Sequence, residues 1–141
     1  MLKKSLLFLF ILSALAFTAC NPTRHIPEGK FLLDRNEIIP DSNLLAKEKF
    51  ESLIREKPNR KLVGFIRFHL WLYNIGKSGK DTKFKTGLRN IGEEPVILDS
   101  VAIEKTLEQF KLFVNKNGFY NGVVSDSVRY NIKKRRAIVE Y

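Results

Sequence analysis

Few side chains in this chain are suited to chemistry, because it has one cysteine and two histidines. His25 and His69 stand far apart, and neither has a carboxylate at the spacing of a metal site, so the sequence does not predict metal binding. We find no serine nucleophile motif and no glycine-rich phosphate loop. The adjacent Glu93 and Glu94 precede Pro95 on a connector, where acidic pairs are usually solvated. We therefore predict a protein that is not an enzyme and carries no cofactor.

Cys20 ends a stretch with the three parts of a secretory signal. Lys3 and Lys4 come first, residues 6–17 are almost wholly apolar, and small residues precede the cysteine. A cysteine at this position is typical of a lipoprotein signal, in which the thiol is acylated and the chain is cut just before it. We therefore predict a signal peptide over residues 1–19 and lipidation at Cys20.

Three other interpretations of Cys20 compete with this one. A transmembrane helix needs about 20 apolar residues, and this stretch is shorter. An ordinary cleaved signal with an incidental cysteine, and a buried cysteine in a cytosolic protein, are the other two. Asn21 after the cysteine is typical of sorting to the outer membrane, and no acidic pair follows closely. We expect a lipid-anchored protein on the periplasmic face of the outer membrane.

The formal charge of the chain is +10, and loss of Lys3 and Lys4 with the signal would leave +8. A basic chain favours nucleic acid, an anionic membrane surface or acidic proteins as partners, and export disfavours nucleic acid. Basic residues are spread along the chain. The middle group is the best candidate for contact with lipid headgroups; it consists of Lys77, Lys80, Lys83, Lys85 and Arg89.

The first half of the mature chain predicts a strand and a helix before an ambiguous segment. Residues 20–30 form a polar tether, residues 31–39 a strand, and residues 43–57 a helix that Pro58 ends. Residues 59–76 are rich in aromatic and apolar side chains, and periodicity does not separate strand from amphipathic helix. Core or inter-domain packing is favoured there over an interfacial helix on a membrane.

The second half contains the clearest helix. Residues 76–87 are expected to be a flexible loop and residues 88–99 a connector. A helix over residues 101–117, capped by Asp99 or Ser100, follows because apolar residues recur at spacings of four, three and four; these are Ile103, Leu107, Phe110 and Val114.

A β-hairpin is predicted after this helix. Gly118 ends the helix, residues 119–132 form a strand, residues 133–136 form a charged turn, and residues 137–141 form a second strand. The order strand, helix, insertion, helix, strand, strand predicts an α+β fold, with a small sheet of about three strands and two helices on one face.

Several motifs carry a resemblance to a known family. They are the helix–glycine–aromatic–strand step NKNGFYNGVV at residues 115–124 and the hairpin sequences VRYN and AIVEY. With the element order, they resemble a POTRA domain, the periplasmic repeat of the BamA/TamA family of outer-membrane assembly and translocation proteins. The resemblance implies a POTRA-like domain over residues 31–141, with an insertion at about residues 59–98 between its helices.

A narrower resemblance covers nearly the whole mature chain. The runs HIPEGKFLLDRNEI, IREKPNRKLVGFIRFHLWLYNIG and LRNIGEEPVILD resemble the lipid-anchored TamA-like (TamL) branch of the family. Members of that branch carry a lipoprotein signal, POTRA domains and a C-terminal β-barrel. The barrel is absent here and the sequence stops within its last strand, so the expectation is an N-terminal fragment, truncated at its C-terminus.

The resemblance implies a binding role in the assembly or translocation of outer-membrane proteins, by addition of a strand to an exposed sheet edge. The expected partners are outer-membrane lipid through acylated Cys20, and outer-membrane protein substrates or assembly subunits, with no nucleic acid. Either the last hairpin or the first strand is open as the exposed edge. The candidate edge residues are Val123, Val124, Val128, Tyr130 and Val139. Candidate membrane or partner contacts are Trp71, Tyr73, Lys77 and Lys80, with core packing favoured for the two aromatic residues.

Two competing functions remain from the sequence. One is a stand-alone small structural outer-membrane lipoprotein, whose basic aromatic segment lies on the membrane. The other is an exported enzyme subunit with its active site on a missing portion.

Overall fold

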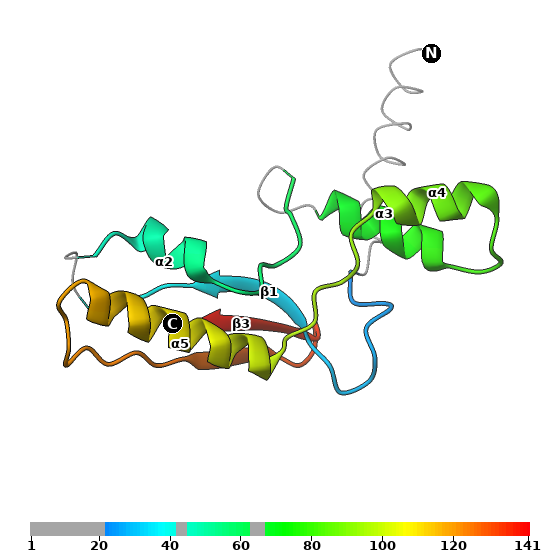
Figure 1. Cartoon of the computed structure of the whole chain (residues 1–141). Coiled ribbons are helices and arrows are strands. Elements are labelled where there is room, and N and C mark those ends of the chain that lie inside the picture. Colours follow the sequence, from blue (N-terminus) through cyan, green and yellow to red (C-terminus); the bar gives the residue numbers. More distant parts are fainter. Residues whose placement is uncertain (1–21, 42–44, 63–66) are drawn as a thin grey trace, which may run out of the picture.

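A computed structural model of the chain describes residues 22–41, 45–62 and 67–141 (Figure 1). Within these ranges, four helices and a three-stranded mixed sheet make an α+β fold, which confirms the predicted fold class. Helices α2 (Lys47–Leu53) and α5 (Ser100–Lys116) lie on one face of the sheet. Helices α3 (Phe68–Lys77) and α4 (Lys83–Ile91) form a hairpin beyond one end of the sheet (Figure 1).

The strands lie in the order β1 (Leu32–Glu37), β3 (Arg136–Glu140), β2 (Ser127–Asn131). β1 and β3 are parallel, with a bulge between Leu33 and Arg35, whereas β2 and β3 are antiparallel. A parallel pair needs a long crossover connection, and the intervening helices provide it. The last strand in the sequence is therefore the central strand of the sheet.

The main core lies between the sheet and helices α2 and α5. Alternation along β3 directs Ala137, Val139 and then Tyr141 toward the helices. The ring of Phe110 on α5 meets Phe50 of α2 at 5.0 Å and Tyr141 at 5.3 Å, both edge to face. Burial of such side chains contributes about 1.5–3 kcal/mol each, so these contacts fix both helices on the sheet.

A second, smaller core joins the start of the described chain to the α3–α4 hairpin. Ile26, Leu32 and Leu70 are buried against one another. The guanidinium of Arg135, in the β2–β3 turn, donates to the Ile26 carbonyl at 3.0 Å. Of the residues expected as a tether, Thr23 and Ile26 are thus buried against the domain, whereas residues 27–30 are exposed.

The helix predicted from the clearest periodicity is confirmed as α5. The Asp99 carboxylate accepts a hydrogen bond from the Val101 N–H at 3.0 Å and caps its first turn. The helix predicted over residues 43–57 is shorter, and residues 43–44 lie outside the described ranges. α2 ends at Leu53 because Ile54 adopts an extended backbone and is buried in the core.

The loop predicted over residues 76–87, and the start of the connector that follows it, are wrong because α4 occupies Lys83–Ile91. The Thr82 hydroxyl caps this helix by accepting from the Lys85 N–H at 3.3 Å. Gly76 belongs to α3, where a Cβ would lie only 2.7 Å from Cγ of Arg89. A glycine that favoured a loop therefore marks a close approach of two helices. Of the ambiguous segment, residues from Phe68 onward are helical and residues 63–66 lie outside the described ranges.

The strand predicted over residues 119–132 is too long. Only Ser127–Asn131 pair, and residues 119–126 form a turn and an extended connection. Gly118 has φ +90°, which only glycine adopts readily, and it ends the helical region as predicted. The charged turn has the predicted length but lies one residue earlier, over residues 132–135, since β2 ends at Asn131 and β3 starts at Arg136.

Candidate protein-binding edge

β2 is an edge strand, because the sheet order ends there and no other strand in the described part of the chain pairs with it. The hydrogen bonds of β3 show which backbone N–H and C=O groups of β2 point away from the sheet. Tyr141 donates its N–H to the Glu37 carbonyl and accepts from the Ile39 N–H, both at 2.8 Å, so it bonds toward β1. Alternate residues of a strand bond to the same side, so Ala137 and Val139 also bond toward β1.

The remaining β3 residues bond toward β2. Ile138 lies opposite Arg129, so the backbone groups of Arg129 bond inward to β3. The neighbouring Val128 and Tyr130 therefore present their N–H and C=O groups to the outer side of the sheet. These are the groups that an added strand would use.

The opposite edge of the sheet is covered along β1. The Leu33 N–H donates to the Val96 carbonyl, and the Leu98 N–H donates to the Phe31 carbonyl, both at 2.8 Å. Further along β1, the Asn36 side-chain amide donates to the carbonyl of residue 56 at 2.8 Å. The sequence leaves both the last hairpin and the first strand as candidates for the exposed edge. Among the described residues, the structure shows that the hairpin strand β2 is free and that β1 is covered.

A groove runs beside this free edge, between β2 and the first half of α5. It has a volume of about 310 Å³. Its apolar lining combines Val128 and Tyr130 of β2 with Ile103 and Leu107 of α5, and its polar lining combines Ser100, Glu104 and Asp126. A strand paired with β2 would direct alternate side chains into this groove and the others to the opposite face of the sheet.

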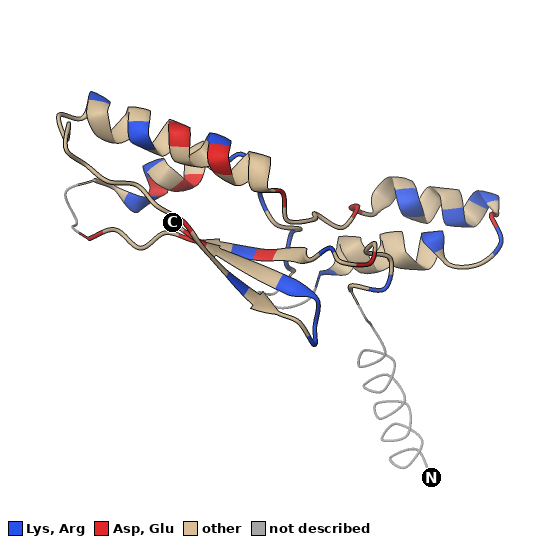
Figure 2. Ribbon diagram, turned by 90° about the horizontal axis from the view of Figure 1, so that it is seen from below, with Lys and Arg blue, Asp and Glu red and all other residues tan. Residues whose placement is uncertain are grey.

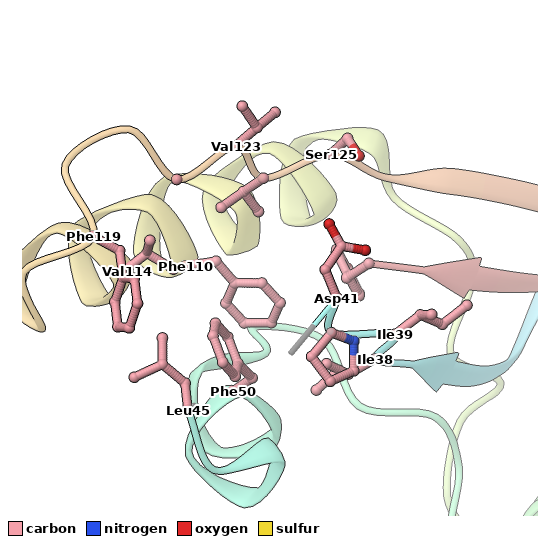
Figure 3. A pocket seen from close by; sticks show the side chains of 14 residues that line it. Ile38, Ile39, Asp41, Leu45, Phe50, Phe110, Val114, Phe119, Val123 and Ser125 are labelled. Carbon is pink, nitrogen blue, oxygen red and sulfur yellow. The ribbon is translucent and has the colours of Figure 1, made fainter. Parts of the chain in front are cut away.

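A second recess of about 300 Å³ lies at the end of the sheet where β1 leaves it, next to the connection that leads into β2 (Figure 3). Phe50 and Phe110 line its floor, and Val124 packs against the same core. Val123 stands on its rim with 92% of its surface exposed. Val123 and Val124 therefore add an apolar surface beyond β2, with the polar Ser125 and Asp126 between them and the strand.

The far face of the sheet behind β2 is polar. The Arg129 guanidinium contacts Glu37 at 2.8 Å and Glu140 at 2.5 Å, and thus ties all three strands together. Under the other face, burial raises the pKa of the Tyr141 hydroxyl, against a hydrogen bond to Thr106 that lowers it. An added strand would meet one apolar and one charged face.

The structure separates the predicted edge residues. Val128 and Tyr130 lie on β2, and Val123 and Val124 lie on the connection that leads into it. The prediction for Val139 is wrong, since this residue is on the central strand and only 1% exposed. The sequence allows Val139 as an edge residue because it does not reveal the parallel pairing of β3 with β1.

The predicted membrane or partner contacts also divide. Lys77, Lys80 and Trp71 are exposed on α3 and the loop after it. Tyr73 is buried, its hydroxyl donates to the Glu94 carboxylate at 2.7 Å, and its ring lies 5.5 Å from the Lys77 Nζ. Tyr73 is therefore a packing residue, as favoured, whereas packing was the wrong choice for Trp71.

Sequence reasoning missed the role of Ile103 and Leu107. Their spacing with Phe110 and Val114 assigned all four to one buried face of the helix. Only the second pair is buried, while the first pair lines the open groove. The spacing identifies the apolar face of α5. It does not show how much of that face the sheet covers, because this depends on where β2 ends.

Cys20 lies outside the described residues. Within the described ranges, no group of three or more histidine, cysteine or acidic side chains is placed to hold a metal ion. No helix in that same part of the chain combines the length and apolar character that a bilayer span needs. Comparison of the chain with models of protein families, with curated proteins and with solved structures finds no match.

Proposed function

We propose that this chain is a POTRA-like periplasmic domain, lipid-anchored at Cys20, that binds extended segments of outer-membrane proteins or a partner subunit by adding them to β2. One observation carries the proposal: among the described residues, the outward backbone groups of Val128 and Tyr130 pair with no strand, and they border a groove lined partly by apolar side chains. Main-chain hydrogen bonds give such an edge an affinity that tolerates many sequences, and the groove adds selectivity.

Two further features support the proposal. The two helices on one face and the helical hairpin inserted between them in the chain agree with the pattern expected from the POTRA resemblance. The sequence around Cys20, with Asn21 after it, supports an outer-membrane lipoprotein that faces the periplasm. Together with the family resemblance, they support a proposed role in assembly or translocation of outer-membrane proteins.

Site-specific photocrosslinking in cells tests binding at β2. A photoreactive residue at the exposed Ser127, at the start of β2, should capture outer-membrane proteins or one assembly subunit, whereas the same residue at Leu112 on α5 should not. Equal capture at both positions would contradict the proposal.

Two proline variants separate edge binding from general damage. Val128→Pro removes an outward N–H, so the sheet should persist while capture is lost. Arg129→Pro removes an inward N–H and should destabilise the sheet itself. Capture by a folded Val128→Pro protein at the wild-type level would count against strand addition.

Lipidation has its own test. Cys20→Ser should abolish acylation and leave an uncleaved precursor, as measured by intact mass. An unchanged mass and unchanged membrane attachment would show that the chain is not anchored through Cys20.

A further inference from the structure

Helix α3 carries an apolar stripe that nothing in the described structure covers. Leu70, Tyr73 and Asn74 are buried on one side of the helix. The other side presents Phe68 and Trp71, whose ring centroids are 5.7 Å apart, and both are exposed. Leu72 and Ile75 extend this stripe at helical spacing and are half-buried.

Helix α4 carries a matching stripe of Phe84, Leu88 and Ile91. The first is 74% exposed and the last is also exposed. The two helices are antiparallel and contact each other at Gly76 and Arg89. With about 3.6 residues per turn and this contact line, both stripes fall on the same side of the hairpin. The hairpin thus has one continuous apolar side.

The hairpin is also strongly basic. It contains five lysine and arginine residues but only one acidic residue, Asp81, whose carboxylate pairs with Arg89 at 2.5 Å. Lys77, Lys80 and Lys83 are exposed at or near the connecting loop. Figure 2 shows lysine and arginine on both helices of the hairpin. Aromatic side chains beside lysines fit an anionic lipid surface better than the apolar interior of another protein.

The path of the chain places this hairpin beside the proposed lipid anchor. The Asn74 side-chain amide donates to the Pro22 carbonyl at 3.5 Å, and the His25 Nε2 contacts the Asn74 carbonyl at 3.2 Å. Cys20 is two residues before Pro22, so their Cα atoms are at most about 7 Å apart. An acyl group on Cys20 would therefore hold α3 close to the bilayer.

The geometry points to the α3–α4 hairpin as a membrane-docking surface, whose apolar side enters the headgroup region and whose lysines contact anionic phospholipids. This inference rests on the proposed anchoring at Cys20, and it goes beyond the binding of partners at β2. Docking would orient the domain on the membrane. The hairpin would lie on the bilayer, and the sheet, at the opposite end of the domain, would lie away from it (Figure 1).

Trp71 is the only tryptophan in the chain and provides the measurement. The full lipidated protein, its acylation verified by mass, is reconstituted into vesicles of phosphatidylcholine with or without phosphatidylglycerol. Brominated lipid should quench Trp71 strongly in the anionic vesicles and weakly in the neutral ones. Trp71 emission that stays unquenched in anionic vesicles would overturn the inference.

Matched variants test the two components of the surface. Each lysine near an anionic surface is worth about fivefold in binding, so Lys77→Gln/Lys80→Gln/Lys83→Gln should lower the docked-to-undocked ratio on the order of 100-fold. The control Lys105→Gln/Lys111→Gln/Lys116→Gln removes the same charge from α5 and should change nothing. Equal losses from both triple variants would refute docking by the hairpin.

Phe84→Ser should also reduce quenching of Trp71, whereas the exposed Leu112→Ser on α5 should not. Failure of this inference is distinguishable from failure of the proposed function. Lost quenching with intact crosslinking at Ser127 rejects membrane docking alone, and intact quenching without crosslinking rejects strand addition alone. If Trp71 responds to an acidic protein partner and not to anionic vesicles, the surface binds protein and the inference is wrong.

Discussion

The ion pair between Asp34 and Arg67 joins the sheet to the helical hairpin, and its two partners should differ in what their removal costs. The Arg67 side chain is 5% exposed, and its Nη2 donates to the Asp34 carboxylate at 2.6 Å and to the Asp34 carbonyl at 2.9 Å. Asp34 sits at the bulge of β1, and Arg67 immediately precedes α3. The pair acts together with the small core around Leu32 and with the hydrogen bonds that Asn74 makes to Pro22 and His25.

Asp34→Ala leaves a buried guanidinium without its carboxylate, which costs about 3–5 kcal/mol of unfolding free energy. Arg67→Met removes the buried charge itself, and Asp34 keeps Arg136 at 3.6 Å and Lys61 at 3.9 Å. We therefore expect Arg67→Met to cost only about 1–2 kcal/mol, since the remaining pairs are partly solvated. Urea unfolding at neutral pH measures both. Equal costs, or a cost below about 1 kcal/mol for Asp34→Ala, would refute this reasoning.

The same pair predicts a pH dependence. Partial burial alone would raise the pKa of Asp34, but the Arg67 hydrogen bond and the charges of Arg67, Lys61 and Arg136 outweigh it, so the pKa lies below the usual 3.8. A lowered native pKa means that the unfolded chain binds the proton more tightly. The stabilisation is therefore full well above pH 3.8 and is lost as the pH falls below that value. Asp34→Asn should remove this part of the acid sensitivity, and an unchanged pH profile would contradict it.

Three further predictions concern stability and are measured by urea unfolding. Phe110→Ala should lower the free energy of unfolding by about 3–5 kcal/mol, because the residue is 2% exposed at the centre of the core. A cost below about 1 kcal/mol would contradict that packing. Gly76→Ala should destabilise, because its Cβ would meet Arg89, whereas Gly87→Ala meets nothing within 4 Å in α4 and should stabilise by about 0.5–1 kcal/mol. The reverse order would show that the two helices do not meet at Gly76. Asp99→Ala removes the cap of α5 and should cost about 1 kcal/mol, and no loss would exclude that cap.

The sequence predicts the parts of the fold whose local and tertiary preferences agree. The spacing of Phe110 and Val114 with their neighbours, the cap at Asp99 and the stop at Gly118 all specify α5. The hairpin of β2 and β3 follows from alternation on both sides of a charged turn. In these elements the residues that set the conformation also make the packing.

The remaining features depend on contacts between distant residues. α4 starts within the glycine- and lysine-rich residues 76–87, so the composition there favours a loop, and only the Thr82 cap suggests a helix start. Its partner α3 stabilises it through the close approach at Gly76. The free edge at β2 follows from the parallel pairing of β1 with β3, which alternation within either strand does not reveal.

Amide hydrogen exchange along β2 tests most directly whether this strand is a free edge that accepts a partner. In the free protein, the Val128 and Tyr130 amides should exchange rapidly, while the Arg129 amide, bonded to β3, should be protected. Addition of an extended peptide from an outer-membrane β-strand should protect Val128 and Tyr130 and leave Arg129 as it was. Protection of Val128 and Tyr130 in the free protein, or exchange unchanged by a bound peptide, would contradict strand addition at β2.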